Sequence, residues 1–178
     1  MTSKRIKRNA SEISQEFLKS MLRYDEDSGQ FIWLVNRRAG AFAGREAGTV
    51  KLKSNGRRYR EIFVCGRAYG VHRLAWLYMT GAWPVSGIDH KDNDGCNNRW
   101  DNLRSADASH NIANAKVYST NTSGKKGVTW HRQCRRWQGQ IKKDGRTFYL
   151  GLFESIDEAH GAYMTKAKEL FGEFARAA

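Results

Sequence analysis

The chain has 178 residues, a net charge of +13 and a sequence pI near 9.9, and 40% of its residues are hydrophobic. This length accommodates one ordinary domain or two small ones, and the charge favours a polyanionic partner, of which nucleic acid is the usual example. The absence of an apolar stretch of the roughly 20 residues that a bilayer requires argues against a membrane protein, and three scattered cysteines without a zinc or disulfide pattern fit a reducing intracellular compartment.

The first half of the chain predicts alternating short helices and strands. In chain order, the expected elements are a helix after Ser14 that ends at the turn of residues 25–29, a strand over residues 31–35, a β-hairpin of residues 59–64 and 67–71, and a helix around Leu74 and Leu77 that stops near Gly81.

The middle of the chain predicts two short strands and a helix. Residues 88–91 form the first strand, residues 102–104 the returning strand, and residues 106–115 the helix, with a turn-rich loop between the strands. This order brings residues 89, 90, 102 and 111 to one place, which their spacing alone does not guarantee.

The C-terminal part begins after a polar segment, residues 119–126, whose composition is typical of a linker. Three strands are expected over residues 127–132, 137–142 and 147–152. Ser155 and Glu158 then form a capping box for a helix with an apolar stripe. Three strands and one amphipathic helix can bury a shared face. The fold class is therefore α+β.

Four polar residues in the middle segment form the most specific chemical pattern. Asp89 offers a hard oxygen ligand for a divalent cation, and His90 offers a base near neutral pH. Asn111 can supply a second oxygen ligand, and Asn102 can fix the orientation of its neighbours. For Asp89-His90 alone, a surface carboxylate beside a structural histidine is the better interpretation. The spacing to the two amides indicates a site that breaks phosphodiester bonds with one metal ion.

The charge distribution fits such a site. Residues 29–60 and 117–178 are basic, whereas residues 61–116 are balanced. A single basic run is usually a solvated face, but two basic flanks around a neutral segment suit a protein that holds phosphates on both sides of a cation.

Residues 71–114 resemble the HNH endonucleases, especially the homing type encoded by phages and introns. The motifs are V-H-R-L-A-W at 71–76, D-H at 89–90, N-N-R-W-D-N-L-R at 97–104 and N-I-A-N at 111–114. The resemblance implies a ββα-metal fold with one Mg²⁺ or Mn²⁺ and no zinc. Asp89 and Asn111 would bind the metal, His90 would activate water, and Asn102 would hold the turn and place the base. Asn114 is interpreted as a cap residue.

Residues 123–174 resemble the Apetala-type DNA-binding domain of plant ethylene-response factors. K-K-G-V-T-W at 125–130, R-W-Q-G-Q-I at 136–141 and Y-L-G-L-F at 149–153 carry this resemblance. It implies a three-stranded sheet in the DNA major groove, and the side chains expected to face DNA are Lys126, Thr129, His131, Gln140, Lys142 and Tyr149. From strand alternation, Val128 and Trp130 should instead meet the helix. Arg146, at a turn, and Arg104, near the site, are expected to contact phosphates.

These patterns predict a metal-dependent, sequence-directed DNA endonuclease of the homing type. The expected domains are a basic N-terminal region (1–70) that contacts DNA or supports the rest, a nuclease core (71–116), a linker (117–126) and a DNA-binding domain (127–178). The partner is double-stranded DNA, with no membrane and no small-molecule cofactor, and a monomer is favoured, in the cytoplasm of a bacterial host if the gene is phage-borne. The alternatives are a non-catalytic DNA-binding regulator that retains the nuclease scaffold and, less favoured, an RNA-binding protein.

Overall fold

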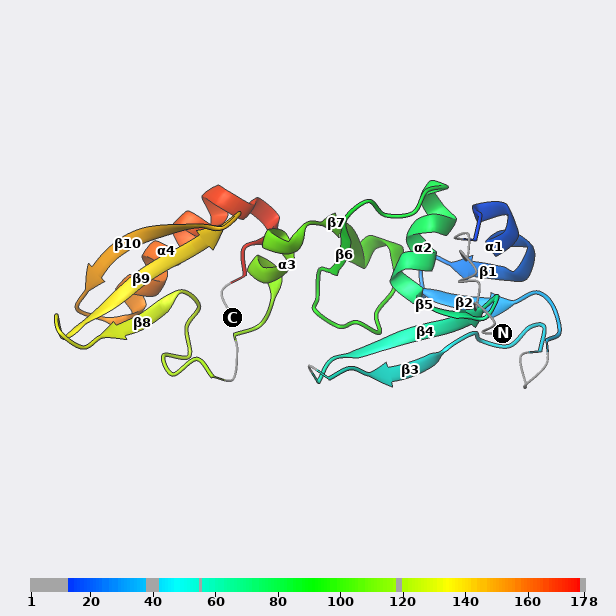
Figure 1. The fold of residues 1–178 in the computed structure, drawn as a ribbon, viewed down its shortest axis with the longest axis horizontal. Coiled ribbons are helices and arrows are strands. Elements are labelled where there is room, and N and C mark those ends of the chain that lie inside the picture. Colours follow the sequence, from blue (N-terminus) through cyan, green and yellow to red (C-terminus); the bar gives the residue numbers. More distant parts are fainter. Residues whose placement is uncertain (1–12, 38–41, 55, 118–119, 177–178) are drawn as a thin grey trace, which may run out of the picture. The chain divides into compact units, whose positions relative to one another are not determined.

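The computed structural model describes residues 13–37, 42–54, 56–117 and 120–176, and these residues divide into two compact units (Figure 1). The first unit comprises the described residues up to Pro84 together with Asn98–Asp101. The second comprises Val85–Asn97 and the described residues from Asn102 onward. Among the helices of these ranges, none has the length and apolar character that a membrane crossing requires.

The first unit begins with a short helix and a hairpin. Helix α1 (Gln15–Met21) is capped by the Ser14 side chain, which confirms the predicted helix start. Strand β1 (Leu22–Asp25) follows at once and pairs antiparallel with β2 (Gln30–Trp33). The expectation that the helix runs directly into the turn is wrong, because buried Leu22 fits the apolar spacing of the helix and the alternation of the strand equally well.

A three-stranded antiparallel sheet and a helix complete the first unit. Its strands, in the order β3-β4-β5, are β3 (Thr49–Leu52), β4 (Arg58–Val64) and β5 (Arg67–Gly70). The predicted hairpin is confirmed by β4 and β5, and the predicted second helix is α2 (Val71–Thr80), which ends at Gly81 in the left-handed conformation. Helix α2 and strand β4 are in contact, and both contribute buried residues to the core of this unit: Ile62 and Val64 from β4, and Leu74 and Leu77 from α2.

Residues Asn98–Asp101 belong to the first unit because the β1–β2 hairpin holds them. Tyr24 Oη donates to the Asn98 carbonyl oxygen at 2.7 Å, and the Trp100 N–H donates to the Glu26 carbonyl oxygen at 3.0 Å. The hairpin turn contains Gly29 at φ +72°, where a Cβ atom would lie 2.3 Å from the Asn98 carbonyl carbon. Only glycine allows this approach.

The second unit begins with the predicted strand–loop–strand–helix order. Strand β6 (Gly87–His90) pairs antiparallel with β7 (Leu103–Ala106), which directly follows the 3₁₀-helix η1 (Trp100–Asn102). Helix α3 (Ala108–Asn114) follows β7, and the Asp107 side chain caps it by accepting from the His110 N–H. The predicted ββα arrangement is confirmed.

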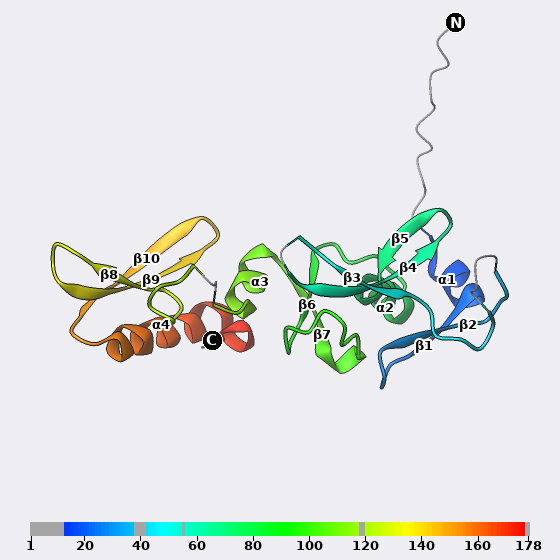
Figure 2. The same cartoon turned by 90° about the horizontal axis from the view of Figure 1, so that it is seen from below.

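A second sheet with one helix completes this unit. Strands β8 (Val128–His131), β9 (Arg136–Lys143) and β10 (Arg146–Phe153) pair antiparallel in the order β10-β9-β8, and helix α4 (Ile156–Phe171) lies along one face of the sheet (Figure 2). Ser155 and Glu158 form the predicted capping box at the start of α4. A 3₁₀-helix, η2 (Gly172–Phe174), directly follows α4. The α+β fold class is confirmed.

Alternation along β8 predicts the wrong surroundings for one tryptophan. Val128 is buried, as expected, but Trp130 remains 47% exposed. The Trp130 ring packs edge-on against Trp137 of β9, with 5.0 Å between ring centroids. Because β8 is the edge strand of the sheet, Trp130 has a neighbouring strand on one side only.

The ββα elements and the C-terminal sheet and helix share a hydrophobic core within the second unit. Ala113 of α3 packs in one buried cluster with Ile141 of β9 and Tyr163 and Phe171 of α4. At the other end of α3, Ser109 Oγ donates to Asp144 Oδ1 at 2.7 Å. The predicted domain limits at residues 71, 117 and 127 stay predictions. The division into compact units does not show which function each segment has.

Candidate active site

Asp89 and His90 lie at the end of β6 on opposite faces of the strand. In the antiparallel register, Asp89 is opposite Arg104 and His90 is opposite Leu103. Both side chains are nearly buried, with 8% exposure for Asp89 and 6% for His90. Successive side chains of a regular strand point to opposite faces. Asp89 and His90 can therefore act on one substrate only if the strand bends or if the two side chains reach the site from different sides.

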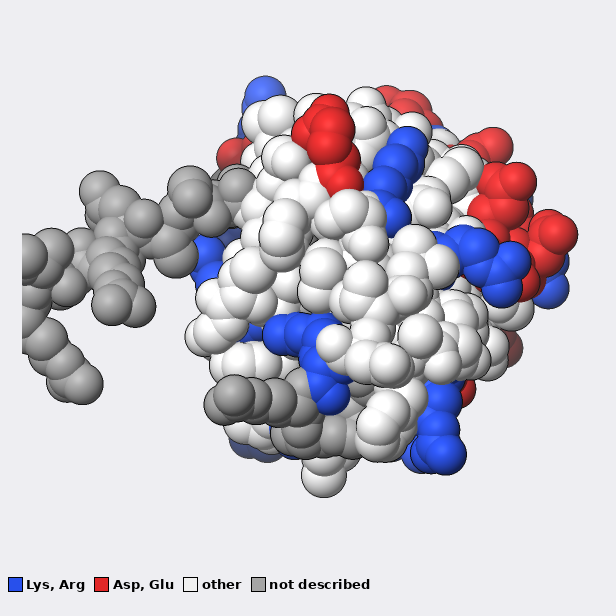
Figure 3. Space-filling view, turned by 90° about the vertical axis from the view of Figure 1, so that its right-hand side faces the viewer, with Lys and Arg blue, Asp and Glu red and all other residues white. Residues whose placement is uncertain are grey.

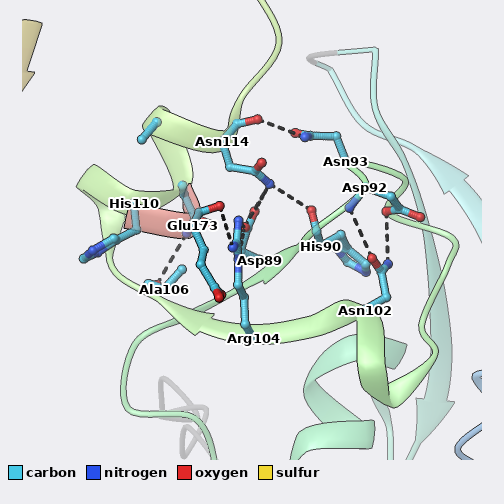
Figure 4. Close-up of polar contacts among 12 residues, drawn as sticks. Asp89, His90, Asp92, Asn93, Asn102, Arg104, Ala106, His110, Asn114 and Glu173 are labelled. Carbon is cyan, nitrogen blue, oxygen red and sulfur yellow. Dashed lines mark hydrogen bonds and ion pairs between the residues drawn. The ribbon is translucent and has the colours of Figure 1, made fainter. Parts of the chain in front are cut away.

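The Asp89 carboxylate receives hydrogen bonds from two side chains (Figure 4). Arg104 Nε and Nη2 each lie 2.9 Å from Asp89 Oδ2. Asn114 Nδ2 lies 3.0 Å from Oδ1 and 2.9 Å from Oδ2. A nearly buried carboxylate requires such partners, since burying an unpaired charge is costly.

Asn114 connects Asp89 to its neighbour. The same Nδ2 atom lies 2.9 Å from the His90 carbonyl oxygen, and the Asn114 carbonyl oxygen accepts from Asn93 Nδ2 at 2.9 Å. With 4% exposure, Asn114 is a buried connection between α3 and the end of β6 rather than only a cap residue. The sequence could have indicated this role, because Asn114 lies three residues after Asn111, and positions i and i+3 of a helix are neighbours on its surface.

Asn102 organises the loop between the two strands. Its Nδ2 donates to Asp92 Oδ1 at 3.0 Å and to the Asn97 carbonyl oxygen at 2.8 Å. Its Oδ1 accepts from the Asp92 N–H at 3.1 Å, and its carbonyl oxygen accepts from the Lys91 N–H at 2.9 Å. These bonds fix the backbone that follows His90, whereas a catalytic role of Asn102 stays a prediction.

Asp92 lies two residues after His90 and interacts with it electrostatically. Burial raises the pKa of the Asp92 carboxyl, but hydrogen bonds from the Asp94 N–H, Asn97 and Asn102, together with the charge of His90, hold that pKa below its usual value. Asp92 is therefore ionised at neutral pH, next to the residue predicted to act as the base.

Asn111 lies near the face of β6 that carries Asp89. Its Nδ2 donates to the Ala106 carbonyl oxygen across a long 3.5 Å, and it would lie 2.9 Å from a Cβ atom at Gly87. Gly87 and Asp89 share a strand face because they are two residues apart. The hydrogen bonds of Asp89 go to Asn114 and Arg104, so a shared ion between Asp89 and Asn111 stays a prediction.

The predicted metal ligands, the Asp89 carboxylate and the Asn111 amide oxygen, are hard oxygen atoms. One carboxylate and a carboxamide oxygen suit Mg²⁺ or Mn²⁺, which keep several water ligands and need few protein ligands. In the part of the chain that the structure describes, no three His, Cys, Asp or Glu side chains gather as a metal cage would require. The predicted ligands therefore suit a single hydrated cation better than an ion enclosed by protein ligands.

The side chains predicted to face DNA lie mostly on the C-terminal sheet, and alternation distributes them as expected. Gln140 is opposite Tyr149 in the register of β9 and β10, and Tyr149 is 62% exposed. Thr129 and Lys142 are exposed, His131 and Gln140 are partly exposed, and Arg146 is exposed at the β9–β10 turn. Contacts of these residues with DNA stay predictions.

Lys126 lies elsewhere. It is only 9% exposed, and its ammonium donates to the Ala113 carbonyl oxygen at the end of α3, 2.7 Å away. Burial, followed by the charge of Arg176, lowers the pKa of Lys126 to about 8. This placement argues against a direct phosphate contact, because the ammonium is directed into the protein. Arg104 is likewise engaged with Asp89 rather than presented to solvent.

The first unit contains the basic segment of residues 29–60, but the Lys and Arg side chains on the face drawn in Figure 3 do not form one continuous patch. There, Lys and Arg side chains are separated by uncharged residues, and acidic side chains gather toward one side. Ion pairs also offset part of its charge, since Lys53 pairs with Glu61 and Arg60 with Glu46. DNA contact by residues 1–70 stays a prediction, and residues 1–12 lie outside the described residues.

Known proteins define the class of the middle segment. Residues 69–113 match the family model of the HNH endonucleases. The chain is 33% identical over 106 residues to Protein 3.8 of Escherichia phage T7, an alignment that covers 59% of this chain and 87% of that protein. The chain therefore belongs to the family of that phage protein and contains an HNH endonuclease domain.

One solved structure is also similar. The structure on DNA binding and cleavage by the HNH homing endonuclease I-HmuI has a TM-score of 0.39 and 18% sequence identity, covering 85% of this chain and 78% of that one. The Apetala-type character of residues 123–174 stays a resemblance in sequence.

Proposed function

We propose that the protein is a metal-dependent, sequence-directed DNA endonuclease of the homing type. The observation that carries the proposal is the nearly buried Asp89-His90 pair at the end of β6, in a ββα arrangement formed within the segment that matches the HNH endonuclease family model, residues 69–113. Asn102 holds the loop behind the pair and Asn114 holds the pair itself, as a site that positions reacting atoms requires.

Each residue of the site has a distinct role in the proposed reaction. His90, unprotonated, accepts the proton of the attacking water, which a base can do within hydrogen-bond reach. Asp89 and the Asn111 amide oxygen hold the divalent cation. When bound, Mg²⁺ or Mn²⁺ stabilises negative charge on the scissile phosphate and the leaving oxygen. Asn102 and Asn114 position His90 and Asp89 through the loop and the β6 backbone.

The substrate is double-stranded DNA. The exposed face of the C-terminal sheet, with Gln140 and Lys142, has the chemistry to read base edges in the major groove. A monomer with one site per chain is proposed. The phage relative fits action in the cytoplasm of a bacterial host.

Cleavage of supercoiled plasmid carrying DNA from the source of the gene tests the proposal. The full chain should cut with Mg²⁺ and stop with a chelator, and His90→Ala should lower the cutting rate by about 10²-fold or more while DNA binding is retained. His160→Ala, a histidine on α4 that stacks on Tyr163, is the matched control and should cut normally. Normal cutting by His90→Ala would remove the proposed base.

Two asparagines on α3 separate chemistry from stability. Asn111→Ala should abolish cutting with little change in the free energy of unfolding, because the hydrogen bond that its side chain donates to the Ala106 carbonyl oxygen is long. Asn114→Ala should lower the free energy of unfolding by about 1–3 kcal/mol, because Asp89 and the His90 carbonyl lose a buried donor. Urea unfolding and plasmid cleavage measure both. Full cutting by Asn111→Ala would remove it from the metal site.

A DNA-binding regulator that retains the nuclease scaffold is the second candidate. The ion pair between Arg104 and Asp89 favours it, since the guanidinium lies where a cation would approach the carboxylate. Specific DNA binding without cutting, in Mg²⁺ or Mn²⁺, would support the regulator over the nuclease.

A further inference from the structure

Arg104 lies between Asp89 and the end of the C-terminal helix. Its Nε and Nη2 contact Asp89 Oδ2 at 2.9 Å. Its Nη1 donates to the Glu173 carbonyl oxygen at 3.2 Å, and its Cζ atom lies 3.5 Å from the centroid of the Phe174 ring. The guanidinium is thus held on one side by the predicted metal ligand and on the other by η2.

Phe174 is itself fixed against the helix that carries Asn111. Its ring centroid lies 4.5 Å from that of His110 on α3, and the same histidine ring contacts Phe171 of α4 at 6.0 Å. Phe174 therefore belongs to the packing between α3 and the end of α4. The face that it offers Arg104 is consequently set by elements of both halves of the second unit.

A guanidinium in this position competes with a divalent cation. The two nitrogens of Arg104 use the lone pairs of Asp89 Oδ2, and arginine remains charged at any ordinary pH. A divalent cation that binds the same carboxylate cannot use these lone pairs. It is also repelled by the positive charge of Arg104 a few ångströms away, in a site that excludes most water. The carboxylate cannot serve both partners fully.

We propose that Glu173 and Phe174 are positioning residues that hold Arg104 on Asp89, so that η2 sets how tightly the nuclease site binds its divalent cation. This inference rests on the proposed function, because it takes Asp89 as a metal ligand. It assigns to the last turn of the C-terminal module a direct effect on the cation site. Arg104 is the group through which η2 acts.

Binding of Mn²⁺ to the full-length protein without DNA, measured by the loss of the free-ion signal in electron paramagnetic resonance, tests the proposal. Arg104→Gln removes the competing charge and should tighten Mn²⁺ binding about tenfold or more. Phe174→Leu removes the ring that holds the guanidinium and should tighten binding about threefold. Phe174→Tyr keeps the ring and should bind as the wild-type protein does.

Two controls make the result specific. Phe148→Leu removes another ring that lies under a guanidinium, that of Arg146 at 5.3 Å, and should leave Mn²⁺ binding unchanged. Asp89→Asn should abolish the high-affinity Mn²⁺ site. Thermal unfolding of each variant identifies any that do not fold, and if Phe174→Leu is among them, Phe174→Met, which also removes the ring and keeps an apolar side chain, takes its place. A folded variant without the ring that binds Mn²⁺ as the wild type does would overturn the inference about η2.

The outcomes separate the two proposals. If Asp89→Asn leaves Mn²⁺ binding intact, the proposed metal site is wrong, and the inference about η2 is overturned with it. If Asp89→Asn abolishes binding but folded Arg104→Gln binds Mn²⁺ no more tightly than the wild type, only the inference fails. Tighter binding by Arg104→Gln and Phe174→Leu, with Phe174→Tyr and Phe148→Leu unchanged, supports it.

Discussion

Lys126 is the residue whose position departs most from the role that its sequence context suggests. By the resemblance to the Apetala-type domain, Lys126, between a polar segment and the first strand of the sheet, is expected to face DNA. In the structure its ammonium instead donates to the last turn of α3. Burial of this ammonium disfavours its charged form, which makes the stability of the second unit depend on pH.

The sign of that dependence follows from the pKa values. The pKa of Lys126 is about 8 in the folded protein, against 10.5 for an ordinary lysine, so the unfolded chain binds more protons between these values. The contribution of Lys126 to stability should therefore rise as the pH increases from 8 to 10.5. Relative to Lys126→Met, the wild-type free energy of unfolding should increase across this window.

Urea unfolding at several pH values measures the difference. Lys168→Met, which removes an exposed lysine of α4, controls for the loss of one charge. A difference between wild type and Lys126→Met that stays constant from pH 8 to 10.5 would show that the ammonium is solvated rather than buried.

The positions of the site residues were more predictable than their hydrogen bonds. The residue types and spacing of Asp89, His90 and Asn102 follow from sequence, and so does their position around one short strand pair. The contacts of Asp89 with Arg104 and Asn114 do not follow, because they depend on which face of β6 meets α3. A one-residue change of register reverses every face.

Among the elements, the approach of β8 to α4 and β9 is set by Gly127. Its φ is +66°, and a Cβ atom there would lie 2.1 Å from Tyr163 Cδ2 and 2.4 Å from the Gln140 carbonyl oxygen. The Gln140 N–H also donates to the Gly127 carbonyl oxygen at 2.8 Å. The start of β8 therefore packs on the sheet and helix at backbone distance.

Gly127→Ala and Gly124→Ala form a matched pair that tests this packing. Gly124 has a similar φ of +69° but open space around its Cα atom, so both substitutions carry the same conformational strain and only one introduces a clash. We expect Gly127→Ala to lower the free energy of unfolding by about 1–3 kcal/mol more than Gly124→Ala does. Equal losses in urea unfolding would contradict the close approach at Gly127.

Most elements could be predicted because their signals are local. The capping box of Ser155 and Glu158, the turn at Cys65-Gly66 and the left-handed Gly81 each mark a boundary that the structure has. Strand β1 was missed because four residues directly after a helix give too short an alternation. The exposure of Trp130 could not be predicted, since it depends on the position of β8 at the edge of the sheet.

At the scale of the whole molecule, the net charge of +13 dominates the expected interaction with DNA. Basic residues that neutralise phosphates release counterions, so the logarithm of the DNA-binding constant should fall linearly with the logarithm of salt concentration. Lys142→Gln, on the exposed face of β9, should reduce the magnitude of that slope by about 1.

Fluorescence anisotropy with labelled duplex DNA at several salt concentrations measures the slope. Lys53→Gln is the matched control, because Lys53 already pairs with Glu61 and its loss should change the slope less. An unchanged slope for Lys142→Gln would place that face of the sheet away from the phosphates.

The division into two units limits how the protein can be cut into separately folded fragments. The polypeptide crosses from one unit to the other after Pro84, again after Asn97 and again after Asp101. One proteolytic nick cannot release either unit whole, and a gene fragment that begins at Val85 carries Asn98–Asp101 without the hairpin that anchors them. Transfer of the segment that contains β6 and β7 to another protein would therefore require the first unit as well, or another structure that holds Asn98–Asp101.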